Sequence, residues 1–134
     1  MSIILAVNPP YAGQLVDGTK RVEWRKKPLP TGDAYIYETK RNGGCGAVIG
    51  RVTIVGNAKI KSGQSIPISL VAWGRVEEDA LTIYANGGDI YANAARYPAR
   101  YKEPKPITAF SRYGDGESFA RAPQSWAYGE ENKA

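Results

Sequence analysis

The chain opens with a run of apolar residues, and the apolar positions that follow are spaced as in a helix. Residues 3–7 are predicted to form a buried strand. Asn8 is placed to cap a helix whose first turn contains Pro9 and Pro10, where a missing N–H costs little. Gly18 offers the left-handed conformation at which helices often end. These residues predict a strand, a short helix and a turn.

The next segment, residues 20–25, alternates between polar and apolar side chains. This alternation predicts a half-buried strand whose Val22 and Trp24 face the core. Strict alternation does not place Lys20 and Glu23 on one face. We therefore expect the turn between the helix and the strand to aim Lys20 separately.

Short apolar runs separated by turn residues continue to the end of the chain. Residues 65–73 fit either a helix or irregular structure, and the alanines within 90–101 suit a helix as well as a strand. Gly50 marks a bend or bulge in a long strand. The other predicted elements are strands at 34–39, 46–55 and 124–128, a helix at 77–86, turns at 31–33 and 42–44, an extended edge segment at 104–106 and a loop at 110–116.

Composition and length limit the fold. Fifteen glycines and nine prolines indicate short elements joined by tight turns rather than a helical bundle. At 134 residues the chain has room for one core. We therefore expect an α+β fold, a small mixed β-barrel with peripheral helices, that forms a single domain over residues 1–130. The tail, residues 131–134, is expected to be frayed.

The charge of the chain adds a functional expectation. The formal net charge is +5 and the pI is about 9.4. This excess favours a polyanionic partner such as a nucleic acid, although a solvated surface of mixed charge fits it almost as well. The cations crowd one short stretch, which contains Lys20, Arg21, Arg25, Lys26 and Lys27.

Two residue types that carry much enzyme chemistry are scarce, because the chain has no histidine and one cysteine, Cys45. This excludes a zinc or di-metal site and a Ser-His-Asp or Cys-His nucleophile, so we expect neither a metal nor a cofactor. Any catalysis must use Lys, Glu, Asp, Tyr, Thr or Ser. The single cysteine, together with no secretory signal and no bilayer-spanning run, predicts a cytoplasmic protein without membrane contact.

Three blocks of the chain carry a family resemblance. They are Asn8–Ala12 with Gly18, Lys20, Glu23 and Arg25, then residues 101–110, then residues 121–128. In this order, over nearly the whole chain, they resemble the signature, the late proline segment and the closing strand of ASCH domains in the PUA-like superfamily. The resemblance implies a PUA-like fold, with RNA or a modified nucleotide as the partner.

The turn after Gly18 lets backbone amides and the Lys20 ammonium converge on one spot. Glu23 can hold Lys20 or Arg25 in place, and Arg25 can present its planar fork to a phosphate or a base edge. An ordinary surface ion-pair ladder is the alternative, since such pairs contribute only about 0–1 kcal/mol. Our leading hypothesis is a nucleic-acid-binding module with a basic cleft, in which one or two tyrosines stack on bases. The candidate binding residues are Lys20, Arg25, Tyr37, Arg51 and Tyr101.

The second hypothesis is an enzyme acting on RNA or nucleosides, with Lys20 and Glu23 as its catalytic residues. Some ASCH relatives hydrolyse the amide of an acetylated cytidine and pair the motif lysine with a threonine and a later glutamate. In this chain Glu23 stands where that threonine would lie, and Arg51 and Thr53 stand where the acid would be wanted. The chain departs from the amidohydrolase pattern, and a metal-independent ribonuclease remains open. A third hypothesis is a regulatory protein that binds a protein partner.

Overall fold

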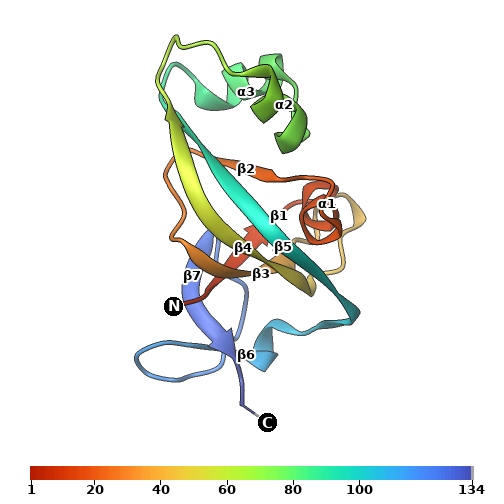
Figure 1. The fold of residues 1–134 in the computed structure, drawn as a ribbon. Coiled ribbons are helices and arrows are strands. Elements are labelled where there is room, and N and C mark those ends of the chain that lie inside the picture. Colours follow the sequence, from red (N-terminus) through yellow and green to blue (C-terminus); the bar gives the residue numbers. More distant parts are fainter. Residues whose placement is uncertain (134) are drawn as a thin grey trace.

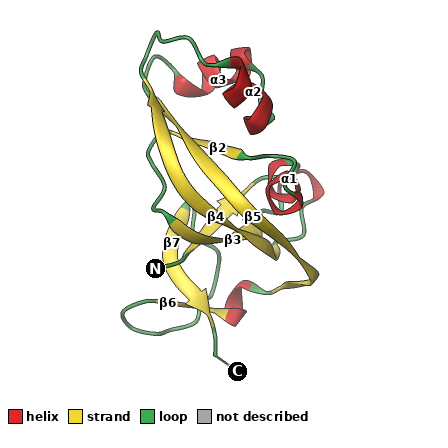
Figure 2. Ribbon diagram, viewed as in Figure 1, coloured by secondary structure: helices red, strands yellow, loops and turns green. Residues whose placement is uncertain are grey.

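The computed structural model describes residues 1–133, which form an α+β fold with a seven-stranded mixed sheet and three α-helices (Figure 1). Strands make up the body of the molecule, and the helices lie at its periphery (Figure 2). The elements in chain order are β1 (Ile3–Val7), α1 (Tyr11–Asp17), β2 (Val22–Arg25), β3 (Gly32–Glu38), β4 (Ala47–Ile60), α2 (Ile68–Gly74), α3 (Glu78–Ala85), β5 (Ile90–Lys105), β6 (Phe110–Arg112) and β7 (Trp126–Glu131).

The strands are arranged in the order β2-β5-β4-β3-β1-β7-β6. The β1–β3 pair is parallel, and the other pairs are antiparallel. This order has two ends, β2 and β6, and no strand ladder joins them within residues 1–133. The predicted α+β class is confirmed, whereas closure of the sheet into a barrel is not detected.

Strand β1 is buried on both faces, as its unbroken apolar sequence predicts. Ile3 and Leu5 belong to a core cluster that includes Leu15 of α1, so this helix covers one face of the sheet. Ile4 faces the other way and packs in a second cluster with Phe110. The centre of the sheet is therefore fixed by apolar contacts from both sides.

Strands β4 and β5 form a long hairpin that extends beyond the rest of the sheet and carries α2 and α3 at its far end (Figure 1). A third apolar cluster lies there and includes Val22 and Trp24 of β2 with Leu81 of α3. The end of α2 also contacts the turn before β2, because the Arg21 N–H donates to the Trp73 carbonyl over 2.6 Å. The helical pair is thus tied to the loop that carries the candidate motif.

Several local predictions are confirmed. Gly18 ends α1 with φ of +83°, and Val22 and Trp24 of β2 are buried. The strand register shifts next to Gly50 against both neighbouring strands, which is the predicted bulge. The ambiguous segment 65–73 contains most of α2.

The predicted start of α1 is wrong. The helix begins at Tyr11, and Pro9 and Pro10 precede it. The Asn8 side chain does not cap the helix, because its Oδ1 instead accepts the Thr39 hydroxyl over 2.6 Å. The Asn8 backbone carbonyl still accepts the Ala12 N–H over 3.1 Å, so Asn8 anchors the helix through its main chain.

Three other predicted boundaries are corrected. Residues 32 and 33, expected in a turn, begin β3, where Asp33 pairs with Thr53 in register and accepts its hydroxyl over 2.9 Å. The predicted loop at 110–116 starts with strand β6, which pairs with β7. The final strand, predicted at 124–128, is β7, which begins at Trp126 and extends to Glu131; position 134 lies outside the described residues.

The bulge beside Gly50 supplies a matched test of packing. A Cβ at Gly50 would lie 2.1 Å from the Ala99 carbonyl oxygen, whereas a Cβ at Gly56 on the same strand meets nothing within 4 Å. We predict that Gly50→Ala lowers the free energy of unfolding by about 1–3 kcal/mol or more, because backbone must shift. Gly56→Ala should change it by less than about 1 kcal/mol. Equal urea denaturation midpoints for the two variants would contradict this packing.

Candidate functional site

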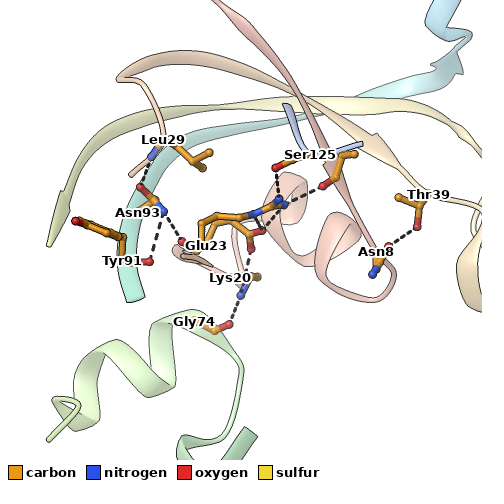
Figure 3. A network of polar contacts seen from close by, with 11 residues as sticks. Asn8, Lys20, Glu23, Leu29, Thr39, Gly74, Tyr91, Asn93 and Ser125 are labelled. Atoms are coloured by element: carbon orange, nitrogen blue, oxygen red, sulfur yellow. Dashed lines mark hydrogen bonds and ion pairs between the residues drawn. The ribbon is translucent and has the colours of Figure 1, made fainter. Parts of the chain in front are cut away.

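The turn between α1 and β2 places Lys20 inside the protein. The backbone N–H of Lys20 donates to the Gln14 carbonyl over 3.0 Å. Lys20 is buried, with only 2% of its surface exposed. Its Nζ donates to the carbonyl oxygen of Gly74, lies 3.7 Å from Glu23 Oε1 and sits 5.0 Å from the centre of the Tyr11 ring. Figure 3 shows the ammonium between Gly74 and Glu23. Lys20 is thus aimed separately from the strand, as the sequence predicted.

Glu23 and Arg25 continue the network along β2. The Glu23 Oε2 accepts Arg25 Nε over 2.9 Å and lies 2.8 Å from Arg25 Nη2. Arg25 Nη2 also donates to the Ala6 carbonyl over 2.8 Å, and Nη1 donates to Ser125 Oγ over 3.3 Å. Arg25 therefore connects β2 to β1 and to the segment before β7 by side-chain hydrogen bonds, across a part of the fold where no strand ladder forms.

Asn93 of β5 holds the backbone on which this network stands. It is fully buried; its Nδ2 donates to the Glu23 carbonyl over 3.0 Å, and its Oδ1 accepts the Leu29 N–H over 2.9 Å (Figure 3). A buried amide with both ends paired fixes the strand and the following loop in one position. Asn93 was not predicted as a site residue, because its strand neighbours give no polar signal.

Burial controls the electrostatics of Lys20. Removal of the ammonium from water lowers its pKa, and the charge of Arg25 acts in the same direction. The Glu23 carboxylate opposes both effects and raises the lysine pKa. The amine is consequently easier to deprotonate than an exposed lysine, while the adjacent carboxylate keeps the buried charge tolerable.

Lys20, Glu23 and Arg25 line one cavity of about 430 Å³, which we call the recess. Its other lining residues include Asn8, Thr39, Tyr11, Trp24, Tyr84 and Gln124. We call the charged side chains of Lys20, Glu23 and Arg25 its floor; aromatic and aliphatic side chains line the rest together with a few polar ones. Lys20 and Arg25 therefore line the same hollow, as the sequence predicted.

The other predicted binding residues lie elsewhere. Tyr37 and Tyr101 pack against the cluster around Phe110, and neither lines the recess. Burial and the nearby Glu131 raise the pKa of Tyr101. Arg51 is half exposed on β4 and lies 3.7 Å from Asp33. The five predicted residues do not form a single site, because the strand register sends these three away from β2.

Sequence reasoning missed part of the recess. Asn8 and Thr39 follow β1 and β3, and these strands pair in parallel, so both residues reach the same edge of the sheet. That parallel pairing could not be read from the sequence. Tyr84 comes from α3, and Trp24 was predicted only as a core residue; both reach the recess because α3 packs against β2.

A basic hollow adjoins the recess. It is lined by Lys26, Lys27, Trp126 and Ser125, and it shares Arg25 and Tyr84 with the recess. Lys26 Nζ lies 5.2 Å from the centre of the Tyr84 ring. No carboxylate lines this hollow. Within the part of the chain that the structure describes, Lys26 and Lys27 at this rim form no ion pair, whereas Lys20 and Arg25 are both paired with Glu23.

The comparisons agree with this architecture. The model of the ASCH domain matches residues 5–128, so the chain belongs to the ASCH domain family of the PUA-like superfamily. Crystal structures of ASCH from Zymomonas mobilis and of its Tyr-to-Phe and Ser-to-Ala variants are similar, with TM-scores of 0.67–0.68 and 20% sequence identity. The similarity covers 95% of this chain and 86–88% of theirs. At this identity it shows the fold alone. No curated protein matches the chain.

Two further observations concern residues 1–133. They contain no group of three or more His, Cys, Asp and Glu side chains arranged to hold a metal ion. No helix in this part of the chain is long and apolar enough to span a bilayer.

The electrostatics of Lys20 can be measured directly. We predict that its amine titrates below the ordinary lysine value of 10.5, and that Glu23→Gln lowers the pKa further by removing the stabilising carboxylate. A carbon-13 NMR titration of the Lys20 Cε resonance, assigned by its loss in Lys20→Met, measures both. A pKa at or above 10.5, or a rise in Glu23→Gln, would contradict the assigned causes.

Proposed function

We propose that this protein binds RNA or a modified nucleotide and that the recess accepts one unstacked base. The observation that carries the proposal is the cluster of Lys20, Glu23 and Arg25 in one cavity that is also lined by the aromatic residues Tyr11, Trp24 and Tyr84. Its volume of about 430 Å³ lies within the range of about 300–1,000 Å³ that is usual for small-molecule sites. A few fixed polar groups in an apolar hollow are what orient such a ligand.

The chemistry of the recess suits a base better than a phosphate. Glu23 already neutralises one of the two cations, so the floor has little excess positive charge for a phosphate. It does hold ammonium and guanidinium donors, a carboxylate acceptor and the side chains of Asn8 and Thr39. Single-stranded RNA is commonly recognised through splayed bases that stack on aromatic rings and form hydrogen bonds at their edges.

The phosphate attached to that base is expected to contact Lys26 and Lys27 in the adjoining hollow. Phosphate contacts position a nucleic acid, and base contacts select it. The basic cleft predicted from the sequence is thus divided in our proposal: the base lies over the paired charges, and the backbone lies over the unpaired ones.

Removal of the two rim charges tests this division. We predict that Lys26→Gln/Lys27→Gln reduces the salt dependence of RNA binding by about 1.4 in the log–log slope, at about 0.7 per phosphate contact. The control Lys61→Gln/Lys102→Gln removes the same charge from exposed lysines outside the recess and this hollow. Fluorescence anisotropy with a labelled oligonucleotide measures both. Identical slopes for the two double variants would refute the phosphate assignment.

Catalysis is a second candidate function, and the buried Lys20 favours it. An amine with a lowered pKa beside a carboxylate can accept a proton, as metal-independent RNA cleavage or nucleoside amide hydrolysis would require. In this alternative Lys20 acts as the base and Glu23 tunes and positions it. No metal or cofactor enters the proposal.

Turnover separates the two functions. The protein is incubated with acetylated cytidine or labelled RNA in the presence of a chelator. An enzyme should show a rate that increases with pH as the Lys20 amine deprotonates, and Glu23→Gln should shift that increase to lower pH. Lys20→Met should abolish turnover, whereas Lys61→Gln should not. If the wild-type protein binds these ligands without turnover, the enzyme hypothesis is wrong and the binding function remains.

Three finer expectations stay predictions. They are the closure of the sheet into a barrel, a domain boundary at residue 130 and a cytoplasmic location. The single exposed Cys45 is consistent with a reducing compartment. Fractionation of cells that express the tagged protein tests its location.

A further inference from the structure

A second surface adjoins the turn that carries Lys20. Two hollows of about 320 and 280 Å³ lie there, and Arg21 and Arg96 line both of them. Lys20 lines the larger hollow and also the recess. The first hollow also contains Tyr97, and the second contains Trp73. We call Arg21, Trp73, Arg96 and Tyr97 the arginine surface. No residue of it belongs to the site described above.

The charge of the arginine surface is uncompensated. Arg21 and Arg96 are exposed, and neither forms an ion pair among residues 1–133. No Asp or Glu lines either hollow. Arg41, Arg75 and Arg121 are likewise exposed without an ion pair among these residues, whereas Arg100 and Arg112 each bind an aspartate; Arg21 and Arg96 differ from all of these because they line the same two hollows. Arg96 Nη1 donates to the Ala95 carbonyl over 3.2 Å, and the remaining donors of the two guanidinium groups are available to an anionic partner.

The aromatic residues of this surface are unusually exposed. Tyr97 is 76% exposed and Trp73 is 42% exposed. Tyr97 lies at a register shift of β5 against β4 and has φ of +54°, a left-handed conformation that is strained for an aromatic residue. This backbone conformation accompanies a ring turned out to solvent beside Arg96, rather than packed in the sheet.

We propose that the arginine surface binds a single-stranded RNA segment that continues from the nucleotide held in the recess. The two hollows share their cations and each has one exposed ring, which suits the phosphates and bases of a single strand: Arg21 and Arg96 contact phosphates, and Tyr97 and Trp73 stack on bases. Lys20, which lines both the recess and the first hollow, lies between the two surfaces. The inference rests on the proposed function and extends the ligand from one nucleotide to a longer single strand.

The charge contribution is tested with Arg21→Gln/Arg96→Gln and a fluorescein-labelled single-stranded RNA of about 12 nucleotides. The backbone N–H of Arg21 that bonds α2 is retained in this variant. We expect affinity to fall at least about tenfold at about 100 mM salt, and the salt slope to fall by about 1.4. The control Arg112→Gln/Arg121→Gln loses the same charge near β6 and β7 and should bind as the wild type does.

The aromatic contribution is tested with Tyr97→Asn. Asparagine adopts the left-handed conformation more readily than tyrosine, so the melting temperature should stay the same or rise. RNA affinity should nevertheless fall several-fold, because the stacking ring is lost. Loss of affinity together with a lower melting temperature would count against stacking, since unfolding would account for it.

The two proposals fail separately. Arg21→Gln/Arg96→Gln should bind a mononucleotide as the wild type does, because the recess is intact. If the wild type binds no mononucleotide, yet the arginine variants still lose oligonucleotide affinity, the base-binding recess is wrong and the arginine surface stands. If these variants match their control, the arginine surface is overturned. No binding of the wild type to the oligonucleotide at low salt overturns it too and favours an acidic protein partner.

Discussion

The structure around the site depends on the burial of one ammonium group. Lys20 is almost fully enclosed, and a buried charge without partners would cost several kcal/mol, on the order of what a small domain has in total. Its two polar partners come from different elements, the carbonyl of Gly74 at the end of α2 and the carboxylate of Glu23 on β2. Arg25 then joins Glu23 to β1 and to the segment before β7. The same network fixes the helical pair, crosses the open part of the sheet and forms the floor of the recess.

The burial of Lys20 also determines which positive charges of the protein are available to a ligand. The cations of the signature motif are occupied by structural and carboxylate partners, so they offer directed donors rather than a free positive field. Cations that form no ion pair within residues 1–133 line the hollows next to the recess: Lys26 and Lys27 in one, and Arg21 and Arg96 in the others. In our proposal, different residues therefore select the base and attract the backbone, which is the usual division in nucleic-acid recognition.

The sequence was informative where the determinants are local. Gly18 and the alternation in 20–25 predicted the turn, the strand and the convergence of Lys20 with Arg25. It failed where strand register decides, since Tyr37, Arg51 and Tyr101 were grouped with the motif by residue type alone. Long-range pairing also hid the contributions of Gly74 and Asn93, whose roles come from partners 54 and 70 residues away. The first helix was predicted to begin too early, because the Asn8 side chain bonds to Thr39 instead of capping the helix.

A crystal structure of the protein with a short single-stranded RNA would show whether the recess accepts a base. We expect one base inside the recess, within hydrogen-bonding distance of the Lys20, Glu23 and Arg25 side chains and in contact with the Tyr11 or Tyr84 ring. An ordered RNA whose bases all lie outside the recess, with the Lys20–Glu23–Arg25 network unchanged beneath an empty hollow, would contradict it.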